Sequence, residues 1–220
     1  MRAPSLVIAV AAAACATATT AEHQTTDAHE ATDAPHNTDG AVHVDAAPGI
    51  DAPAGSCTTP TTGVLATWAF TGQPGSQVST PAASSATGIV AGPVARSGGV
   101  SAVSGAGSIN SNGWELGSAR NLAKYYTLTI APPSGCQLDL TKLAIDANAS
   151  SSGPAMGSVA TSADAFAATT AASTAAPSTP ALAVVGASGM IEVRIYGFAA
   201  LAASGTFRIQ NTLTISGSLH

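Results

Sequence analysis

The chain is poor in charge and in aromatic rings. Charged residues make up 9% of its 220 residues and aromatic residues 4%. Its seven Lys and Arg residues are scattered along the sequence, whereas proteins that bind nucleic acid concentrate such residues into a basic patch. Nucleic acid is therefore not an expected partner.

Residues 57–220 also lack the usual means of catalysis. They contain one His, His220, and two Cys, Cys57 and Cys136. Neither a Cys–His nucleophile nor a zinc cluster is predicted from this set. There is no Gly-rich phosphate loop and no nucleophile elbow. The sequence predicts no catalytic residue, no metal site and no cofactor.

Residues 16–56 are short of basic side chains. They contain no Lys or Arg, seven Asp or Glu, and four of the five His, so the formal charge of −5 arises here. Asp-Ala units recur, as in Thr26-Asp27-Ala28 and Thr32-Asp33-Ala34, without a sustained apolar period. Such composition predicts a disordered segment, the tether, whose flexible span is roughly 35 Å.

Four histidines recur beside carboxylates in the tether: His23, His29, His36 and His43. Two interpretations are open, weak capture of Zn²⁺ or Cu²⁺ and incidental His in a solvated linker. The linker is favoured, because tight metal binding needs a preset geometry.

The first fifteen residues have the layout of a signal peptide. Arg2 precedes an apolar run at 6–14, which is too short to cross a bilayer, and Cys15 follows it. Ala12-Ala13-Ala14-Cys15 resembles a bacterial lipobox, with Ala12 where Leu is usual. We therefore predict a lipoprotein-type signal at 1–15 and lipidation of Cys15; ordinary cleavage after 16–18 is the alternative. The expected location is the bacterial cell envelope, either anchored to the outer membrane or secreted.

The clearest structural pattern lies at the C-terminal end. Ile191, Val193 and Ile195 alternate with polar residues, and at 207–219 apolar side chains fall on odd positions. This period of two predicts strands with one buried face. Asn211 interrupts the apolar register and is interpreted as either a bulge or a buried polar group.

Further strands are predicted upstream, at 64–70, 89–95, 124–130, 138–145, 155–162 and 182–185. Gly92-Pro93 interrupts the second, and a phase slip predicts a bulge near Thr141-Lys142. In the first strand, the predicted buried face carries Val64, Ala66, Trp68 and Phe70. Residues 165–176 are predicted to form a loop or one short turn, because Thr, Ser and nearby Pro oppose a helix.

Eight to ten short strands separated by turns predict an all-β domain at 57–220, an antiparallel jelly-roll β-sandwich. The last strand, 207–219, is expected to pack close to 64–70 and to place Trp68 in the core. Cys57 and Cys136 are expected to form a disulfide, which would contribute about 4 kcal/mol in the chain-entropy model. Two free thiols are the alternative.

Six segments together resemble a group of secreted bacterial jelly-roll domains that are common in surface proteins and largely uncharacterised. Ala165 stands where that pattern usually has Gly, and Gln210-Asn211 where it has Asp-Asn. The resemblance implies a surface domain with glycan binding as a candidate role, and supplies no catalytic residues. The segments are 65–75 (LATWAFTGQPG), 105–114 (GAGSINSNGW), 125–130 (YYTLTI), 161–166 (TSADAF), 195–198 (IYGF) and 205–211 (GTFRIQN).

The candidate ligand-binding residues are Trp114, Glu115, Arg194, Tyr196 and Arg208. Trp114 beside Glu115 would give an aromatic platform with a polar neighbour, although core packing is the commoner role of such a Trp. The other three are expected to point outward from their strands. Arg194 and Glu192 share a strand face, which a surface ion pair explains.

The expected function is a lipid-anchored cell-surface protein that displays a non-catalytic β-sandwich for adhesion or glycan binding. Its expected partners are an extracellular glycan or a surface protein, and the membrane is reached through the lipid anchor alone. The alternatives are a structural envelope component and a sandwich-type glycan hydrolase. A hydrolase would need two facing carboxylates among the five in 57–220: Glu115, Asp139, Asp146, Asp164 and Glu192.

Overall fold

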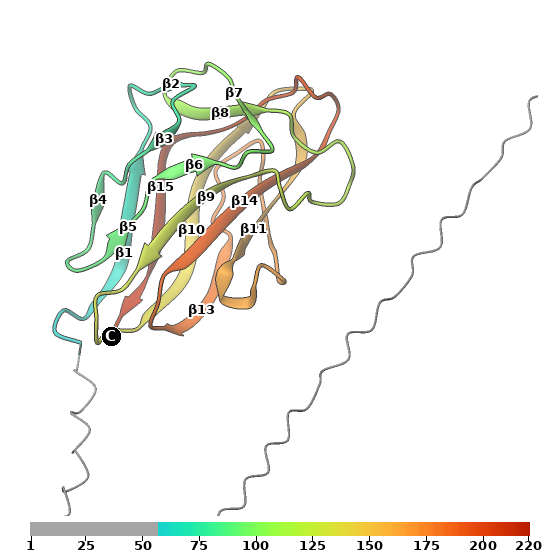
Figure 1. The fold of residues 1–220 in the computed structure, drawn as a ribbon. Coiled ribbons are helices and arrows are strands. Elements are labelled where there is room, and N and C mark those ends of the chain that lie inside the picture. The colour runs from blue at the N-terminus through green and yellow to red at the C-terminus, as the bar shows by residue number, and fades with distance from the viewer. Residues whose placement is uncertain (1–56) are drawn as a thin grey trace, which may run out of the picture. The chain divides into compact units, whose positions relative to one another are not determined.

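The computed structural model describes residues 57–220, which form two facing layers of β-strands (Figure 1). Sheet A runs in the order β13 (Ala181–Ala187), β10 (Leu138–Ala149), β15 (Phe207–Leu219), β1 (Thr61–Ala69) and β4 (Ser84–Ser85). Three strands are attached to this path through β8, which itself pairs with β15: β8 (Ser108–Asn112), β2 (Pro74–Gly75) and β7 (Ser101–Ala102).

Sheet B runs in the order β12 (Thr170–Ala172), β11 (Pro154–Thr161), β14 (Ile191–Ala200), β9 (Tyr125–Ala131), β6 (Val94–Arg96) and β3 (Ser79–Thr80), and β5 (Val90–Ala91) also pairs with β9. The strand pairs are antiparallel except β2 with β8. The predicted all-β sandwich is therefore confirmed. Within 57–220, no helix is long and apolar enough to span a membrane.

Several predictions concern residues before 57. The signal peptide at 1–15, lipidation of Cys15, the tether at 16–56 and its four histidines all lie outside the described residues. They stay predictions.

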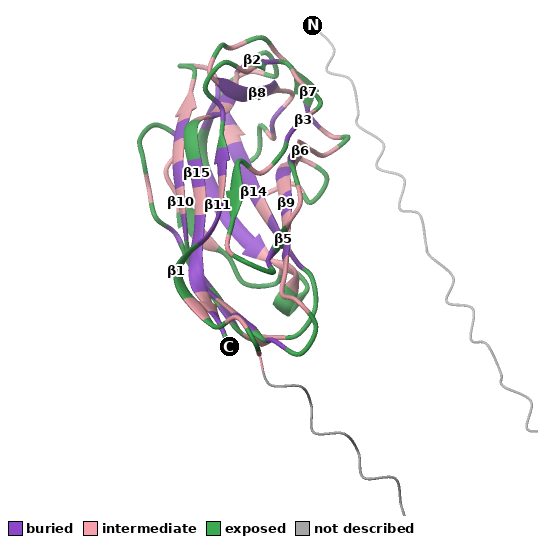
Figure 2. Ribbon diagram, turned by 90° about the vertical axis from the view of Figure 1, so that its left-hand side faces the viewer, coloured by how far each residue is buried: buried purple, intermediate pink, exposed green. Residues whose placement is uncertain are grey.

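The core lies between the two sheets and is made by alternate residues of the long strands. Along β14, for example, Ile191, Val193 and Ile195 are buried, and the alternation shows as bands of colour along the ribbon (Figure 2). Trp68 is fully buried, and its indole Nε1 donates a hydrogen bond to the carbonyl of Gly92 over 2.9 Å. That bond joins sheet A to the segment between β5 and β6 of sheet B.

The last strand pairs with the first, as predicted. β15 lies antiparallel beside β1, with Thr61 opposite Leu219 and Trp68 opposite Leu213. The predicted position of Val64 on the buried face is wrong, because its side chain is 57% exposed. The register between the two strands shifts between Val64 and Ala66, and such a bulge turns the residue before it to the other face.

Two bulges foreseen from the sequence are present. Asn211 has a left-handed φ of 55° and an exposed side chain, so the bulge interpretation is confirmed and the buried polar group is not. Residues on either side of it pair with different strands, 207–210 with β8 and 212–219 with β1. The second bulge lies between Leu140 and Lys142, where β10 shifts register against β15.

The two ends of the described chain meet at one end of the sandwich. Cys57 and Cys136 form the predicted disulfide, with Cα atoms 4.5 Å apart. The backbone N–H of Gln137 donates to the carbonyl of His220 over 2.6 Å, so the C-terminus lies at the same place. In Figure 1 this is the lower end, and β2, β7 and β8 lie at the opposite end.

At that opposite end, Arg96 of β6 holds the two sheets together. Its Nε donates to Ser111 Oγ over 2.7 Å and its Nη2 to the Asn110 carbonyl over 2.8 Å, both on β8 of sheet A. Further hydrogen bonds reach the carbonyls of Gly75 and Gln77. Burial lowers the pKa of the guanidinium, and the carbonyls stabilise its charge in place of a carboxylate.

The segment 165–176 was predicted to be a loop or a turn, and this is partly wrong. A 3-10 turn at Ser162–Asp164 precedes it, and Thr170–Ala172 forms the edge strand β12. Ala165 and Phe166 follow the turn in left-handed conformations, with φ of 57° and 63°. Propensity does not reveal β12, because its three small residues are ordered by pairing with β11.

Candidate functional site

The outward face of sheet B carries a group of side chains that we call the Arg–aromatic cluster: Arg120, Tyr125, Phe166, Arg194 and Tyr196. Three of them come from β9 and β14, where they alternate with core residues. Tyr125 is paired with Tyr196, and Thr127 with Arg194, so their side chains share this face. Arg120 and Phe166 come from loops.

Arg194 lies at the centre of the cluster. The carbon of its guanidinium is 3.8 Å from the centre of the Phe166 ring and 4.4 Å from that of Tyr125. Glu192, two residues earlier, accepts hydrogen bonds from Nε at 2.7 Å and Nη2 at 3.1 Å. The guanidinium is therefore fixed by cation–π contacts on two rings and by a bidentate carboxylate.

The ion pair shifts the pKa of both partners. Hydrogen bonding from Arg194 lowers the pKa of the Glu192 carboxyl, and a further hydrogen bond from Thr127 Oγ1, 2.8 Å long, acts in the same direction. The hydrogen bond to Glu192 raises the pKa of Arg194. Both groups are consequently charged at neutral pH.

Phe166 reaches Arg194 by means of a strained backbone. A left-handed φ is uncommon for any residue with a side chain, and here Ala165 and Phe166 adopt it in succession. Backbone bonds hold the turn, from Phe166 N–H to the Thr161 carbonyl over 2.9 Å and from Ala165 N–H to the Ser162 carbonyl over 3.2 Å. Such strain costs roughly 1–3 kcal/mol per residue and gathers at functional sites.

Arg120 covers the other part of the cluster. Its Nη2 donates to the Phe166 carbonyl over 2.6 Å, and its guanidinium carbon lies 5.2 Å from the centre of the Tyr196 ring. The loop that carries Arg120 is anchored to β14 by the Ala199 N–H, which donates to the Gly117 carbonyl over 2.9 Å. Arg120 thus links the Phe166 turn to the sheet.

Three buried polar atoms of this region have no hydrogen-bond partner among the described residues. They are Arg120 Nη1, the Tyr196 hydroxyl and Ser158 Oγ. Ser158 lies directly opposite Tyr196 across β11 and β14, and Arg120 lies over the Tyr196 ring. Buried polar atoms normally have hydrogen-bond partners. Three unpartnered polar atoms beside Tyr196 therefore set this part of sheet B apart from an ordinary packed surface.

Trp114 cannot provide the predicted aromatic platform, because its side chain is 1% exposed. Its ring packs edge-on against Tyr126 and Phe207, with centroids 5.2 Å and 5.3 Å away, and its Nε1 donates to the Ser111 carbonyl over 2.8 Å. Trp114 therefore belongs to the core, which was the alternative interpretation.

Glu115, the neighbour of Trp114 in the sequence, is partly exposed. It accepts hydrogen bonds from Asn121 Nδ2 at 2.8 Å and the Gly117 N–H at 3.1 Å, and Lys124 Nζ lies 3.6 Å away. The bond from Asn121 is the main reason that the pKa of Glu115 is lowered. These contacts order the loop that leads to Arg120.

Of the three residues expected to point outward, two come together. Arg194 and Tyr196 share the outward face of sheet B, but Tyr196 is 0% exposed because the cluster covers it. The expectation of an accessible Tyr196 is therefore wrong. Arg208 alternates with the buried Phe207 and Ile209 of sheet A, so it faces outward on the opposite side of the sandwich.

Arg120, Tyr125 and Phe166 were not foreseen as site residues. Tyr125 has a signal in the sequence, since it occupies the polar face of a predicted strand. Phe166 follows Ala165, and both adopt a left-handed φ, which glycine adopts without strain. Nothing in the sequence indicates Arg120, because its loop makes a tertiary contact.

The charged groups of this region are held in place by their neighbours. Among residues 57–220, no group of three or more His, Cys, Asp or Glu side chains lies close enough to hold a metal ion. The carboxyls with shifted pKa values, Glu115 and Glu192, are both shifted downward, whereas a general acid needs a raised pKa. The cluster offers fixed donors, a fixed carboxylate and two partly exposed aromatic rings.

No protein-family model, no curated protein and no solved structure matches this chain.

Proposed function

We propose that this chain is a lipid-anchored cell-surface protein whose β-sandwich, of jelly-roll type, is displayed for adhesion or glycan binding and is not catalytic. The main support is Arg194, held on the outward face of sheet B between Tyr125, Phe166 and Glu192. Its position depends on Phe166, which the chain keeps in a strained left-handed conformation. A purely solvated arginine would need no such support.

The chemistry of the cluster matches that of a sugar. Glycans present hydroxyl groups that both donate and accept hydrogen bonds, and ring C–H groups that pack on the faces of aromatic rings. The Arg194 guanidinium can donate, and the Glu192 carboxylate can accept. Because both are fixed by their neighbours, little side-chain entropy is lost on binding.

The attachment of the domain supports display. The described chain begins at Cys57, and the disulfide to Cys136 fixes this residue at the end of the sandwich where the C-terminus also lies (Figure 1). An anchor at Cys15 and the tether at 16–56 would hold the domain from that end. Both faces of the sandwich would then remain accessible to a partner.

A binding role without catalysis is favoured by how the carboxylates are used. Glu192 is paired with Arg194, Glu115 with Asn121 and Lys124, and Asp146 with Gln210 and Asn211. Asp139 accepts a hydrogen bond from the Gly186 N–H, and Asp164 accepts one from the Ala168 N–H. Each carboxylate is thus engaged by its own neighbours rather than by another carboxyl, whereas a glycosidase uses two that flank one bond.

A glycan array probed with the fluorescently labelled protein tests the proposal. We expect at least one glycan to bind, and Arg194→Gln to weaken that binding at least tenfold. Arg208→Gln is the matched control, because it removes an arginine from the opposite outward face, and it should leave binding unchanged. Absence of binding to any glycan at millimolar concentration would refute the glycan proposal.

A structural envelope component is the second candidate. It is favoured by one observation, that the rings of Tyr125 and Phe166 face the Arg194 guanidinium and so have less surface free for a sugar. If the cluster serves to cover sheet B, Arg194→Gln should lower the melting temperature by several degrees, and no glycan should raise it in either protein.

A further inference from the structure

The edge of sheet A formed by β13 is open. β13 is the last strand in the sheet order and pairs with β10 alone. Its seven residues, Ala181–Ala187, carry no charge, and Val185 is 85% exposed. Natural sheets protect exposed edges with charges, proline or bulges. β13 carries no charge and no proline, and its pairing with β10 shifts register twice.

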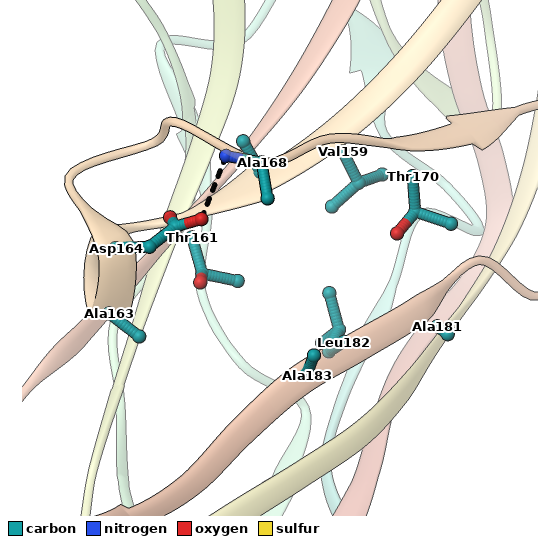
Figure 3. A pocket seen from close by; sticks show the side chains of 10 residues that line it. Val159, Thr161, Ala163, Asp164, Ala168, Thr170, Ala181, Leu182 and Ala183 are labelled. Carbon is teal, nitrogen blue, oxygen red and sulfur yellow. Dashed lines mark hydrogen bonds between the residues drawn. The ribbon is translucent and has the colours of Figure 1, made fainter.

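A pocket of about 150 Å³ lies beside this edge, between the two sheets (Figure 3). One wall comes from Ala181, Leu182 and Ala183 of β13, and the other from β11, β12 and the turn between them. This is comparable to the volume of a protein cavity that accepts one benzene molecule. A single aliphatic side chain therefore fits.

The pocket lies where a side chain of a strand added beside β13 would point. A strand added beside β13 would lie in the plane of sheet A, with alternate side chains directed toward sheet B. On this side of the sandwich, the space between β13 and sheet B is the pocket, lined by Leu182 from one sheet and Val159 from the other. An inward side chain of the added strand would therefore enter it.

The pocket also selects the side chain. Asp164 is the one charged residue in its lining, and Figure 3 shows its carboxyl group at one side of the opening, where Oδ2 accepts a hydrogen bond from the Ala168 N–H over 2.8 Å. The rest of the lining consists of small and aliphatic residues and two threonines, Thr161 and Thr170. Such walls with one exposed carboxylate suit a lysine, whose four-carbon stem is apolar and whose ammonium is cationic.

We infer that β13 and this pocket bind an extended segment of a partner protein by β-strand addition, with a lysine side chain of the segment in the pocket. A second copy of β13 could not place a lysine in the pocket, because the strand contains no basic residue. The pocket shares the Ser162–Asp164 turn with the Arg–aromatic cluster, but Arg194 does not line it. Arg194→Gln therefore alters the cluster and leaves the lining of the pocket as it is.

The test uses a fluorescein-labelled peptide, Thr-Val-Thr-Lys-Thr-Val-Thr, and the full chain, with binding followed by fluorescence anisotropy. Strand addition depends on backbone hydrogen bonds, so N-methylation of alternate peptide residues should abolish binding. Replacing the lysine by norleucine keeps the stem and removes the charge. We expect Asp164→Asn to weaken the lysine peptide about two- to fivefold, the size of an exposed ion pair, and to leave the norleucine peptide unchanged.

Hydrogen exchange locates the site. The amides of 181–187 should exchange more slowly with the lysine peptide bound, and Arg194→Gln should give the same protection. Equal binding of the N-methylated peptide, or protection elsewhere than β13, would overturn the inference. Self-association of the protein that is lost on Ala183→Pro, without peptide binding, would assign the edge to a second copy instead.

Discussion

Glu192 and Arg194 lie two residues apart on β14 and are joined by two hydrogen bonds, of 2.7 Å and 3.1 Å. Residues at this spacing share a face of a strand, so the pairing follows from the sequence alone. Their surroundings do not, because Tyr125 comes from the neighbouring strand and Phe166 from a turn some thirty residues earlier. The position of Arg194 therefore depends on one local contact and on two rings from other segments.

Stability should depend on the charge of Glu192. Its pKa is lowered in the folded protein, so the stabilisation is present above the unfolded-state pKa, about 4.3, and is lost as pH falls through the folded value. Glu192→Gln should therefore cost roughly 0.5–1 kcal/mol of unfolding free energy at pH 7, because the pair is partly exposed. Urea unfolding at pH 7 and pH 3 measures the difference, which should shrink at pH 3; a difference independent of pH would contradict the assignment.

Ala165→Gly should stabilise the protein. Glycine adopts the left-handed φ found there without the steric cost that a Cβ brings, and the expected gain is about 1 kcal/mol. Ala163→Gly is the matched control in the same turn, and it should destabilise because glycine only adds freedom to the unfolded chain. Urea denaturation at neutral pH gives the unfolding free energy of both variants. An equal decrease of this free energy in the two would mean that position 165 is not strained.

Arg96→Lys should destabilise the domain although it conserves the charge. Lysine cannot reach the carbonyls of Gly75, Gln77 and Asn110 together, so at least one buried acceptor is left unsatisfied, at a cost of about 2 kcal/mol. Chemical denaturation gives the free energy. Arg208→Lys is the comparison, because the Nε of Arg208 is buried but has no hydrogen-bond partner among the described residues. A similar small effect in both variants would show that the carbonyl contacts of Arg96 contribute little.

Removal of the disulfide should lower the unfolding free energy by about 4 kcal/mol, because Cys57 and Cys136 are 79 residues apart and the bond restricts the unfolded chain. The double variant Cys57→Ser/Cys136→Ser isolates this effect. Its unfolding in urea should match that of the reduced natural protein, and a loss below 1 kcal/mol would indicate that the ends of the domain are held by other contacts.

Much of the fold could be predicted from the sequence, because it depends on short-range patterns. The period of two at 191–195 and 207–219 identifies β14 and β15, and the phase slip at Thr141-Lys142 identifies a bulge. Val64 was assigned to the wrong face because the bulge beside it does not change the phase of the apolar pattern. Val64, Ala66 and Trp68 still fall on every second position, although the register shifts between Val64 and Ala66.

The candidate site could be predicted only in part. Arg194 and Glu192 were identified because they share one strand face. For Trp114 the sequence left a binding platform and core packing open, and the structure shows core packing against Phe207. The exposure of Tyr196 was misjudged, because burial of an aromatic ring depends on what covers it, here Arg120. Such contacts join segments that are far apart in the chain, so they cannot be predicted from composition or from periodicity.

The most direct test of the central claim, that the Arg–aromatic cluster is the recognition surface, is a nitrogen-15 NMR titration of the protein with the glycan panel, following the side-chain Nε–Hε signals of its arginines. The proposal predicts that Arg194 and Arg120 shift with added glycan, while Arg208 and Arg96 keep their positions. Shifts at Arg208 instead, or no shift at any arginine at millimolar glycan, would contradict it.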